Sequence, residues 1–132
     1  MIVLSRRILI ATAACGLLAS VMPAWATERQ PYTEAAFLAA QKAGRSIVVE
    51  VHAPWCPICA KQKVVMEQLE KKPEFDKLLI FAVDFDTQKD VLKKFRVTRQ
   101  STYISFTGTD EMQRSTGITD PMSLEALLQT AL

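Results

Sequence analysis

The sequence predicts an α/β domain with a central mixed sheet of about four strands flanked by helices. Apolar, β-branched runs of strand length alternate with helical patterns, and a pair of strands joined by a turn follows near the C-terminus. Strands that alternate with helices favour a parallel sheet with right-handed crossovers, and a closing hairpin adds an antiparallel edge. At 132 residues, 49% of them hydrophobic, the chain suits one compact domain.

The first half of the predicted domain contains a helix, a strand and a second helix. Thr33 is a suitable N-cap, and a glycine a suitable end, for a helix over residues 33–44. The apolar run over residues 46–52 is typical of a strand buried on both faces. Helical spacing of apolar and charged residues then predicts a helix over residues 59–72, which a proline ends.

The second half continues the alternation and closes with the hairpin. Residues 78–85 form another buried-type strand, and residues 90–95 have the pattern of a short helix. Strands over residues 101–107 and 111–115 enclose Gly-Thr-Asp, which predicts a hairpin turn. A last helix over residues 121–132 carries its leucines on one face.

The N-terminal segment differs in kind from this domain. Two arginines precede an apolar stretch over residues 8–21, and Ala-Trp-Ala closes the segment. This is the pattern of a secretory signal peptide, and the stretch is shorter than the roughly 20 residues that span a bilayer core. We therefore expect a signal peptide over residues 1–26, a domain over residues 27–132 and a periplasmic location, with an uncleaved membrane anchor as the alternative.

Cleavage would leave a mature chain with no formal net charge. The full chain has 16 Lys and Arg against 14 Asp and Glu, and Arg6 and Arg7 belong to the predicted signal. No basic stripe with interleaved aromatic residues remains, so we expect no nucleic acid partner. Cleavage also removes Cys15 and leaves Cys56 and Cys59 in a compartment where disulfides form and persist.

The remaining two cysteines form a Cys-Pro-Ile-Cys motif between a predicted strand and a predicted helix. A structural zinc site needs about four ligands, whereas the mature chain offers this pair, His52 and carboxylates. A structural disulfide here would close a very short loop, which the chain-entropy model rewards little. A C-x-x-C in this setting is the arrangement used for thiol–disulfide exchange.

Position in the helix assigns a role to each residue of the motif. Cys56 is the expected nucleophile, because unpaired N–H groups and the dipole at a helix N-terminus favour a thiolate. Cys59, one turn further on, would resolve the mixed disulfide formed at Cys56. Pro57 fits the first turn, because the helix does not use the N–H that proline lacks. The pair carries the electrons itself, so we expect no dissociable cofactor.

Around this motif the chain resembles the thioredoxin superfamily. Residues 53–59, APWCPIC, are similar to the W-C-x-x-C active site, with a strand before them and a helix after them. Residues 83–86 resemble the third strand of the family, residues 95–97 the segment before its cis-proline loop, and Gly117 the glycine after its hairpin. The resemblance implies a thioredoxin fold and thiol–disulfide oxidoreductase activity.

The resemblance also implies a groove for the substrate beside the cysteine pair. One residue of this groove departs from the family pattern. Ser101 stands immediately before Thr102, at the position of the family's cis-proline. A non-proline cis bond costs about 2.5–4 kcal/mol, so we expect Ser101 to be trans or strained. The expected substrate-binding residues are Trp55, Pro57, Ser101 and Thr102.

The polar positions near the motif depart from the family pattern as well. Glu50 replaces the family's buried aspartate and, if buried, could relay a proton to or from Cys59. A salt-bridged carboxylate at a strand edge is the alternative for Glu50. Ala82 and His52 stand where many thioredoxins have a lysine and a second tryptophan.

In an oxidising compartment a reductant must be recharged, and the resemblance implies a membrane thiol–disulfide transporter as the electron donor. The expected clients are exported proteins with disulfides, including apocytochromes of c type, and we expect a monomer. An oxidase or isomerase stays open, because the sequence does not give the stability of the Cys56 thiolate. The alternative to an enzyme is a binding module that holds a metal ion or iron–sulfur cluster on Cys56 and Cys59. His52 or a second copy of the chain would then supply further ligands. A third is a non-catalytic interaction protein.

Overall fold

A computed structural model describes residues 26–132, so the predicted signal peptide over residues 1–26 lies outside the described residues except for Ala26. The elements in chain order are β1 (Glu28–Pro31), α1 (Glu34–Lys42), β2 (Ser46–His52), α2 (Pro57–Leu69), the 3-10 helix η1 (Pro73–Phe75), β3 (Leu79–Asp84), α3 (Lys89–Phe95), β4 (Thr102–Thr107), β5 (Asp110–Thr116) and α4 (Pro121–Gln129). Over this part of the chain, no helix has the length and apolarity needed to cross a membrane.

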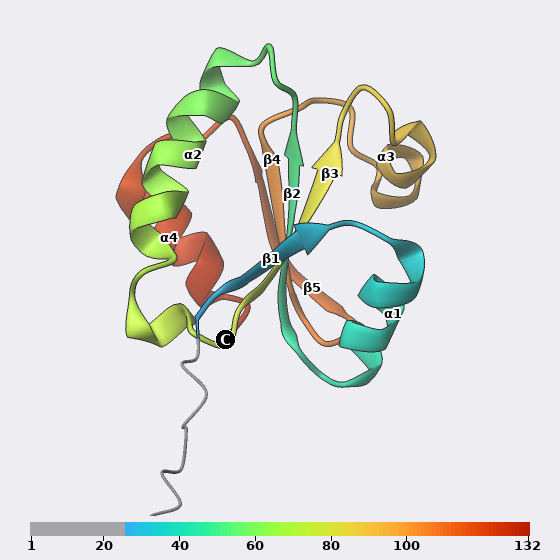
Figure 1. Cartoon of the computed structure of the whole chain (residues 1–132), viewed down its shortest axis with the longest axis vertical. Coiled ribbons are helices and arrows are strands. Elements are labelled where there is room, and N and C mark those ends of the chain that lie inside the picture. The colour runs from blue at the N-terminus through green and yellow to red at the C-terminus, as the bar shows by residue number, and fades with distance from the viewer. Residues whose placement is uncertain (1–25) are drawn as a thin grey trace, which may run out of the picture.

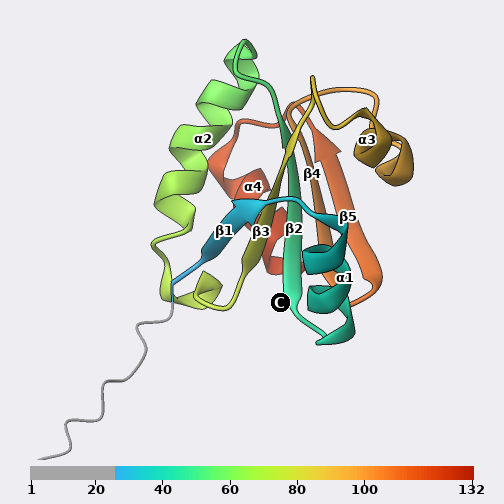
Figure 2. The same ribbon diagram turned by 45° about the vertical axis from the view of Figure 1, so that its right-hand side comes forward.

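Within the described residues, five strands form one mixed sheet in the order β1-β3-β2-β4-β5. β3 pairs in parallel with both β1 and β2, whereas β4 pairs antiparallel with β2 and with β5. Helices α2 and α4 cover one face of the sheet, and α1 and α3 cover the other (Figure 1). Figure 2 shows the same two layers after rotation. The predicted α/β class with a mixed sheet is confirmed.

β1 is the strand that the sequence patterns did not predict. Its residues, ERQP, show no alternation of apolar and polar side chains, and all but Gln30 are exposed. Backbone pairing with β3, from Glu28 opposite Leu79 to Pro31 opposite Ala82, holds it at the edge of the sheet. Because Pro31 ends an edge strand, the N–H that proline lacks removes no hydrogen bond between inner strands of the sheet.

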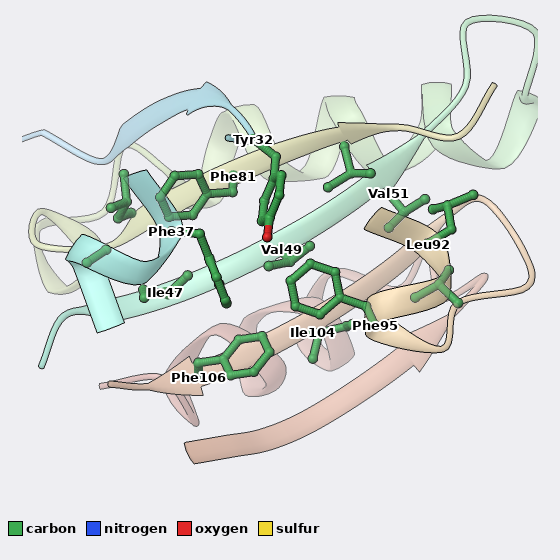
Figure 3. Packing of buried hydrophobic residues seen from close by; sticks show 14 residues of the cluster. Tyr32, Phe37, Ile47, Val49, Val51, Phe81, Leu92, Phe95, Ile104 and Phe106 are labelled. Carbon is green, nitrogen blue, oxygen red and sulfur yellow. The ribbon is translucent and has the colours of Figure 1, made fainter. Parts of the chain in front are cut away.

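Aromatic rings fill the core between the sheet and helices α1 and α3 (Figure 3). Phe37 of α1 lies at the centre, with ring centroids 5.3–5.6 Å from those of Tyr32, Phe81, Phe95 and Phe106. Tilted and edge-to-face pairs of this kind contribute about 0.5–1.5 kcal/mol each beyond the area they bury. This cluster fixes one face of β2 and β4 and leaves the other face to α2 and α4.

The central strand β2 leads directly to the cysteine motif. Residues 47–51 of this strand are all buried, so its end is held firmly in the sheet. The chain leaves β2 at His52 and enters α2 at Pro57, at the top of Figure 1. Sites in open α/β sheets lie at the carboxyl ends of parallel strands, and β2 and β3 both end here.

Candidate active site

Cys56 is the N-cap residue of α2. Its backbone is extended, with φ −86° and ψ 112°, and its Sγ accepts a hydrogen bond from the backbone N–H of Cys59 at 3.1 Å. Pro57 occupies the first turn, where its missing N–H costs no helical hydrogen bond. The thiol of Cys56 thereby takes the place that a serine or aspartate oxygen takes in other helix caps, where negative charge is favoured.

The two thiols of the motif have different pKa values. Burial would raise the pKa of Cys56, but hydrogen bonds from the thiol and backbone of Cys59, the side chain of Gln100 and the backbone of Ile58 outweigh it, so this pKa is lowered. Burial, together with the hydrogen bond to Cys56, raises the pKa of Cys59 to about 11. Of the two thiols, Cys56 is therefore the one that ionises more readily, and Cys59 keeps its proton at neutral pH.

The two sulfur-bearing residues also differ in their surroundings. Cys56 is only 3% exposed, whereas Cys59 is partly exposed. Cys59 lines a cavity of about 590 Å³ that Cys56 does not line. Glu50 and His52 of β2 line the same cavity.

Glu50 is buried in β2 and belongs to a polar network that the sequence did not predict. The hydroxyl of Tyr103 donates to its Oε1 at 2.5 Å, and the guanidinium of Arg29 donates to its Oε2. Arg29 also donates to Oε1 of Glu70 at 2.5 Å. Glu50 is thus a salt-bridged carboxylate, as one alternative held, but it lies in the central strand and not at an edge.

Charge and burial fix the protonation of the partners of Glu50. Burial would lower the pKa of Arg29, but the carboxylates of Glu70 and Glu50 outweigh it and raise this pKa. Burial and the charge of Glu50 raise the pKa of Tyr103 above its ordinary value. The guanidinium therefore stays charged and the phenol keeps the proton that it donates.

Ser101 is both trans and strained, as expected from its identity. No peptide bond between residues 26 and 132 is cis, and Ser101 has φ 59°, a left-handed conformation that costs a non-glycine residue about 1–2 kcal/mol. Gln62 of α2, itself 1% exposed, donates from Nε2 to the carbonyl oxygens of Ser101 at 3.2 Å and Ile118 at 2.8 Å. This buried amide ties α2 to the loop beside the cysteine pair.

The expected substrate-binding residues differ in exposure. Trp55 is 57% exposed, and its Nε1 donates to Oδ2 of Asp86 at 2.9 Å. Pro57 is exposed beside it, whereas Ser101 and Thr102 are buried. A partner that reaches Cys56 would therefore meet the indole of Trp55, and the Ser101 loop would offer its backbone.

Four residues of the site were missed by the sequence patterns: Arg29, Gln62, Gln100 and Tyr103. The sequence offered a weak signal for one of them. Gln62 follows Cys59 by three residues, so it lies on the same side of α2 as the motif. The others reach the site only through the pairing of strands and the path of a loop.

A metal site within one chain has little support in the geometry. Among the residues from 26 to 132, no group of three or more His, Cys, Asp and Glu side chains is placed to hold a metal ion. His52 lies at the end of β2 and lines the cavity with Cys59.

Comparisons with known proteins agree with this architecture. The family model described as thioredoxin matches residues 15–130. The crystal structure of Trxlp from Edwardsiella tarda EIB202 has a TM-score of 0.75 and 42% identity, and the match covers 76% of this chain and 98% of that one. A thioredoxin structure from Malassezia sympodialis, at 21% identity over 81% of this chain and 93% of that one, shares the fold with a TM-score of 0.70.

Curated relatives match over shorter stretches. The mitochondrial thioredoxin of Bos taurus is 31% identical over 85 residues, 63% of this chain and 49% of the relative. A thioredoxin H-type of Fagopyrum esculentum is 30% identical over 81 residues, 61% of this chain and 68% of the relative. The match spans about half the length of the mammalian mitochondrial thioredoxins. The family model, the sheet and the position of the Cys-Pro-Ile-Cys motif together show that the chain belongs to the thioredoxin family.

Proposed function

We propose that this chain is a thioredoxin-like thiol–disulfide oxidoreductase that reduces disulfides of exported proteins in the periplasm. The observation that carries the proposal is the pair of unlike thiols at the start of α2. The pKa of Cys56 is lowered by hydrogen bonds that outweigh its burial, whereas burial raises that of Cys59 to about 11. The exchange requires a nucleophilic thiol that ionises more readily than the resolving thiol, which keeps its proton until the second step.

The reaction runs in two exchanges that transfer two electrons. The Cys56 thiolate attacks one sulfur of the partner's disulfide, whose other sulfur leaves as a thiolate, and a mixed disulfide forms. Cys59 then loses its proton and attacks Sγ of Cys56, which releases the partner's second sulfur. The partner ends as a dithiol, and Cys56 and Cys59 end as a disulfide.

Glu50 is the proposed relay for the proton of Cys59. Both residues line the same cavity, and Glu50 is held in place there by Arg29 and Tyr103. Glu50→Gln keeps the size of the side chain and removes the carboxylate. It should slow release of the partner from Cys56 more than it slows the first attack, because only the second exchange deprotonates Cys59.

The sequence and the family support the proposal that the chain acts as a reductant in the periplasm. The segment over residues 1–26 has the pattern of a signal peptide, and the relatives are named thioredoxins. In that compartment the oxidised pair must be reduced again, so we propose a membrane thiol–disulfide transporter as the donor. Exported proteins with disulfides, including apocytochromes of c type, are the proposed clients of a monomeric chain.

Trapping of mixed disulfides tests the proposal. The Cys59→Ser variant should accumulate disulfides between Cys56 and exported proteins, and the Cys56→Ser, Cys59→Ser variant is the matched control. If the Cys59→Ser variant traps no more partner than the control does, the proposal is contradicted. Stoichiometric metal after anaerobic purification, lost in Cys56→Ala, would instead favour the metal-binding alternative.

A further inference from the structure

A basic edge of the molecule, close to the Ser101 loop, has no part in the exchange reaction described above. Along α3 and the loop that follows it, five cations lie within a short stretch of chain: Lys89, Lys93, Lys94, Arg96 and Arg99. Lys94 forms an ion pair with Glu34, and Nζ of Lys89 lies 4.3 Å from the centroid of the Phe85 ring. The two arginines of this edge are engaged differently.

Arg96 and Arg99 line a small pocket together with Arg114 of β5. Both are exposed, and in the part of the chain that the structure describes neither of them forms an ion pair. Arg114 is held in place, because its Nη1 donates to the carbonyl oxygen of Phe95 at 3.0 Å and its other nitrogens donate to the carboxylate of Glu111 at 2.6 and 2.9 Å. The three guanidinium groups therefore carry more positive charge than Glu111 offsets.

The rest of the pocket lining is uncharged and rich in hydroxyl groups. It consists of Val97, Thr98, Thr102 and Thr116, so no Asp or Glu of the described chain lines the pocket. Its volume of about 250 Å³ is below the roughly 300–1,000 Å³ of small-molecule sites, and suits a single side chain. Guanidinium groups bind carboxylates through paired N–H donors. The size and the charge of the pocket together fit the side chain of a Glu or an Asp.

The pocket lies at the end of the sheet that carries the cysteine motif. Thr102 pairs with Val51, which is next to the last residue of β2. Figure 2 shows the start of β4 and the end of β5 at the same end of the sheet as the start of α2. Two Cα–Cα steps, together at most about 7.6 Å, separate Arg99 from Ser101. A client segment a few residues long can therefore reach from the cysteine pair to the pocket.

We propose that this pocket binds the carboxylate of an acidic residue that lies one to three positions from the reactive cysteine of a client protein. The inference rests on the proposed function and narrows its clients to exported proteins with a Glu or an Asp beside the disulfide. The carboxylate pairs with Arg96 and Arg99 while the client's sulfur meets Cys56. This contact speeds the first exchange by improving binding and leaves the chemistry at the sulfur unchanged.

Two matched disulfide peptides test the inference. One carries Glu two residues before its first cysteine and two residues after its second, and the other carries Gln at both positions. Each rate of reduction by the reduced protein is divided by the rate with uncharged dithiothreitol, which corrects for differences between the disulfides themselves. The corrected rate should be about three- to tenfold higher for the Glu peptide at about 0.02 M salt, as expected of one or two partly exposed ion pairs, and the difference should shrink at about 0.5 M salt.

The two ways of failing are distinguishable in this experiment. Equal corrected rates for the two peptides would overturn the inference and leave the proposed function in place. A protein that reduces neither peptide would overturn the proposed function as well.

Substitutions show whether the pocket itself selects the Glu peptide. Arg99→Gln and Arg96→Gln should each bring the ratio of the two corrected rates down toward one. Lys71→Gln removes an exposed cation just beyond the end of α2 that is opposite the motif, and as the matched control it should keep the full ratio. An equal loss in Lys71→Gln would mean that net charge selects the peptide, and this result would overturn the assignment to the pocket.

Discussion

The hydroxyl of Tyr103 donates a 2.5 Å hydrogen bond to the carboxylate of Glu50 inside the sheet. The two residues lie on adjacent strands, opposite each other in the register of β2 and β4. Arg29 donates to the same carboxylate from β1, which lies on the opposite side of β2 from β4 in the strand order. Three strands thus supply one polar network around the buried Glu50, whose carboxylate shares a cavity with Cys59.

Tyr103→Phe should lower the free energy of unfolding by about 1.5–3 kcal/mol, the contribution of a hydrogen bond to a charged group. The phenyl ring keeps the packing of a fully buried side chain and removes only the hydroxyl. Urea unfolding measures the change. Tyr32→Phe is the control, because Tyr32 donates to Glu34, which is exposed, and should lose less than about 1 kcal/mol. Equal losses in the two variants would contradict a buried, charged network at Glu50.

Arg29→Met should lower the free energy of unfolding by about 1–3 kcal/mol, because it leaves the buried Glu50 without its cation. The value lies between those of exposed and buried pairs, since 36% of the Arg29 side chain is exposed. Combining it with Glu50→Gln should cost less than the sum of the single changes, with a coupling above about 0.5 kcal/mol. Additive losses would show that the pair is not coupled.

Alkylation by iodoacetamide at neutral pH should modify Cys56 before Cys59. The pKa of Cys56 lies below the ordinary value of 9.0, because hydrogen bonds outweigh burial, whereas burial raises the pKa of Cys59 to about 11. At neutral pH the thiolate fraction of Cys59 is therefore at least about a hundredfold smaller than that of Cys56. This factor outweighs the greater exposure of Cys59. Modification of Cys59 should become appreciable only as the pH rises toward about 11. Peptide mapping after timed quenching checks the order, and earlier labelling of Cys59 would contradict it.

Gln62→Leu should destabilise the protein by about 1–3 kcal/mol, because it removes the donor shared by the carbonyls of Ser101 and Ile118. Gln68→Leu, at an exposed position of the same helix, is the matched control and should stay within about 0.5 kcal/mol of the wild type. The amide of Gly117, which donates to Ser101, should exchange its hydrogen faster in Gln62→Leu. Unchanged exchange would mean that this glutamine does not hold the loop.

Local signals explain how much of the fold the sequence could predict. Thr33 caps α1, and its hydroxyl accepts a hydrogen bond from the N–H of Ala36. Such a cap involves only residues close in sequence, so the sequence could predict it. The long apolar runs became β2 and β3, and the motif fell at the start of α2, because strand length and helix caps are properties of neighbouring residues. The identity of Ser101 likewise predicted a trans or strained residue, which its φ of 59° confirms.

The parts that could not be predicted depend on contacts between distant segments. β1 has no periodicity of its own and exists through its pairing with β3. With β1 unplaced, nothing in the sequence put Arg29 beside Glu50. Gln62 is polar in an amphipathic helix, which indicates a solvated side chain, and it is buried only because α2 lies against the Ser101 loop.

The reduction potential of the Cys56–Cys59 pair tests the central claim most directly. It is measured on the chain from Thr27 by equilibration with glutathione. A value near or below roughly −270 mV, the potential of thioredoxin, is the result expected of a reductant. A value near roughly −120 mV, that of a strong disulfide donor, would contradict the proposed direction of electron flow.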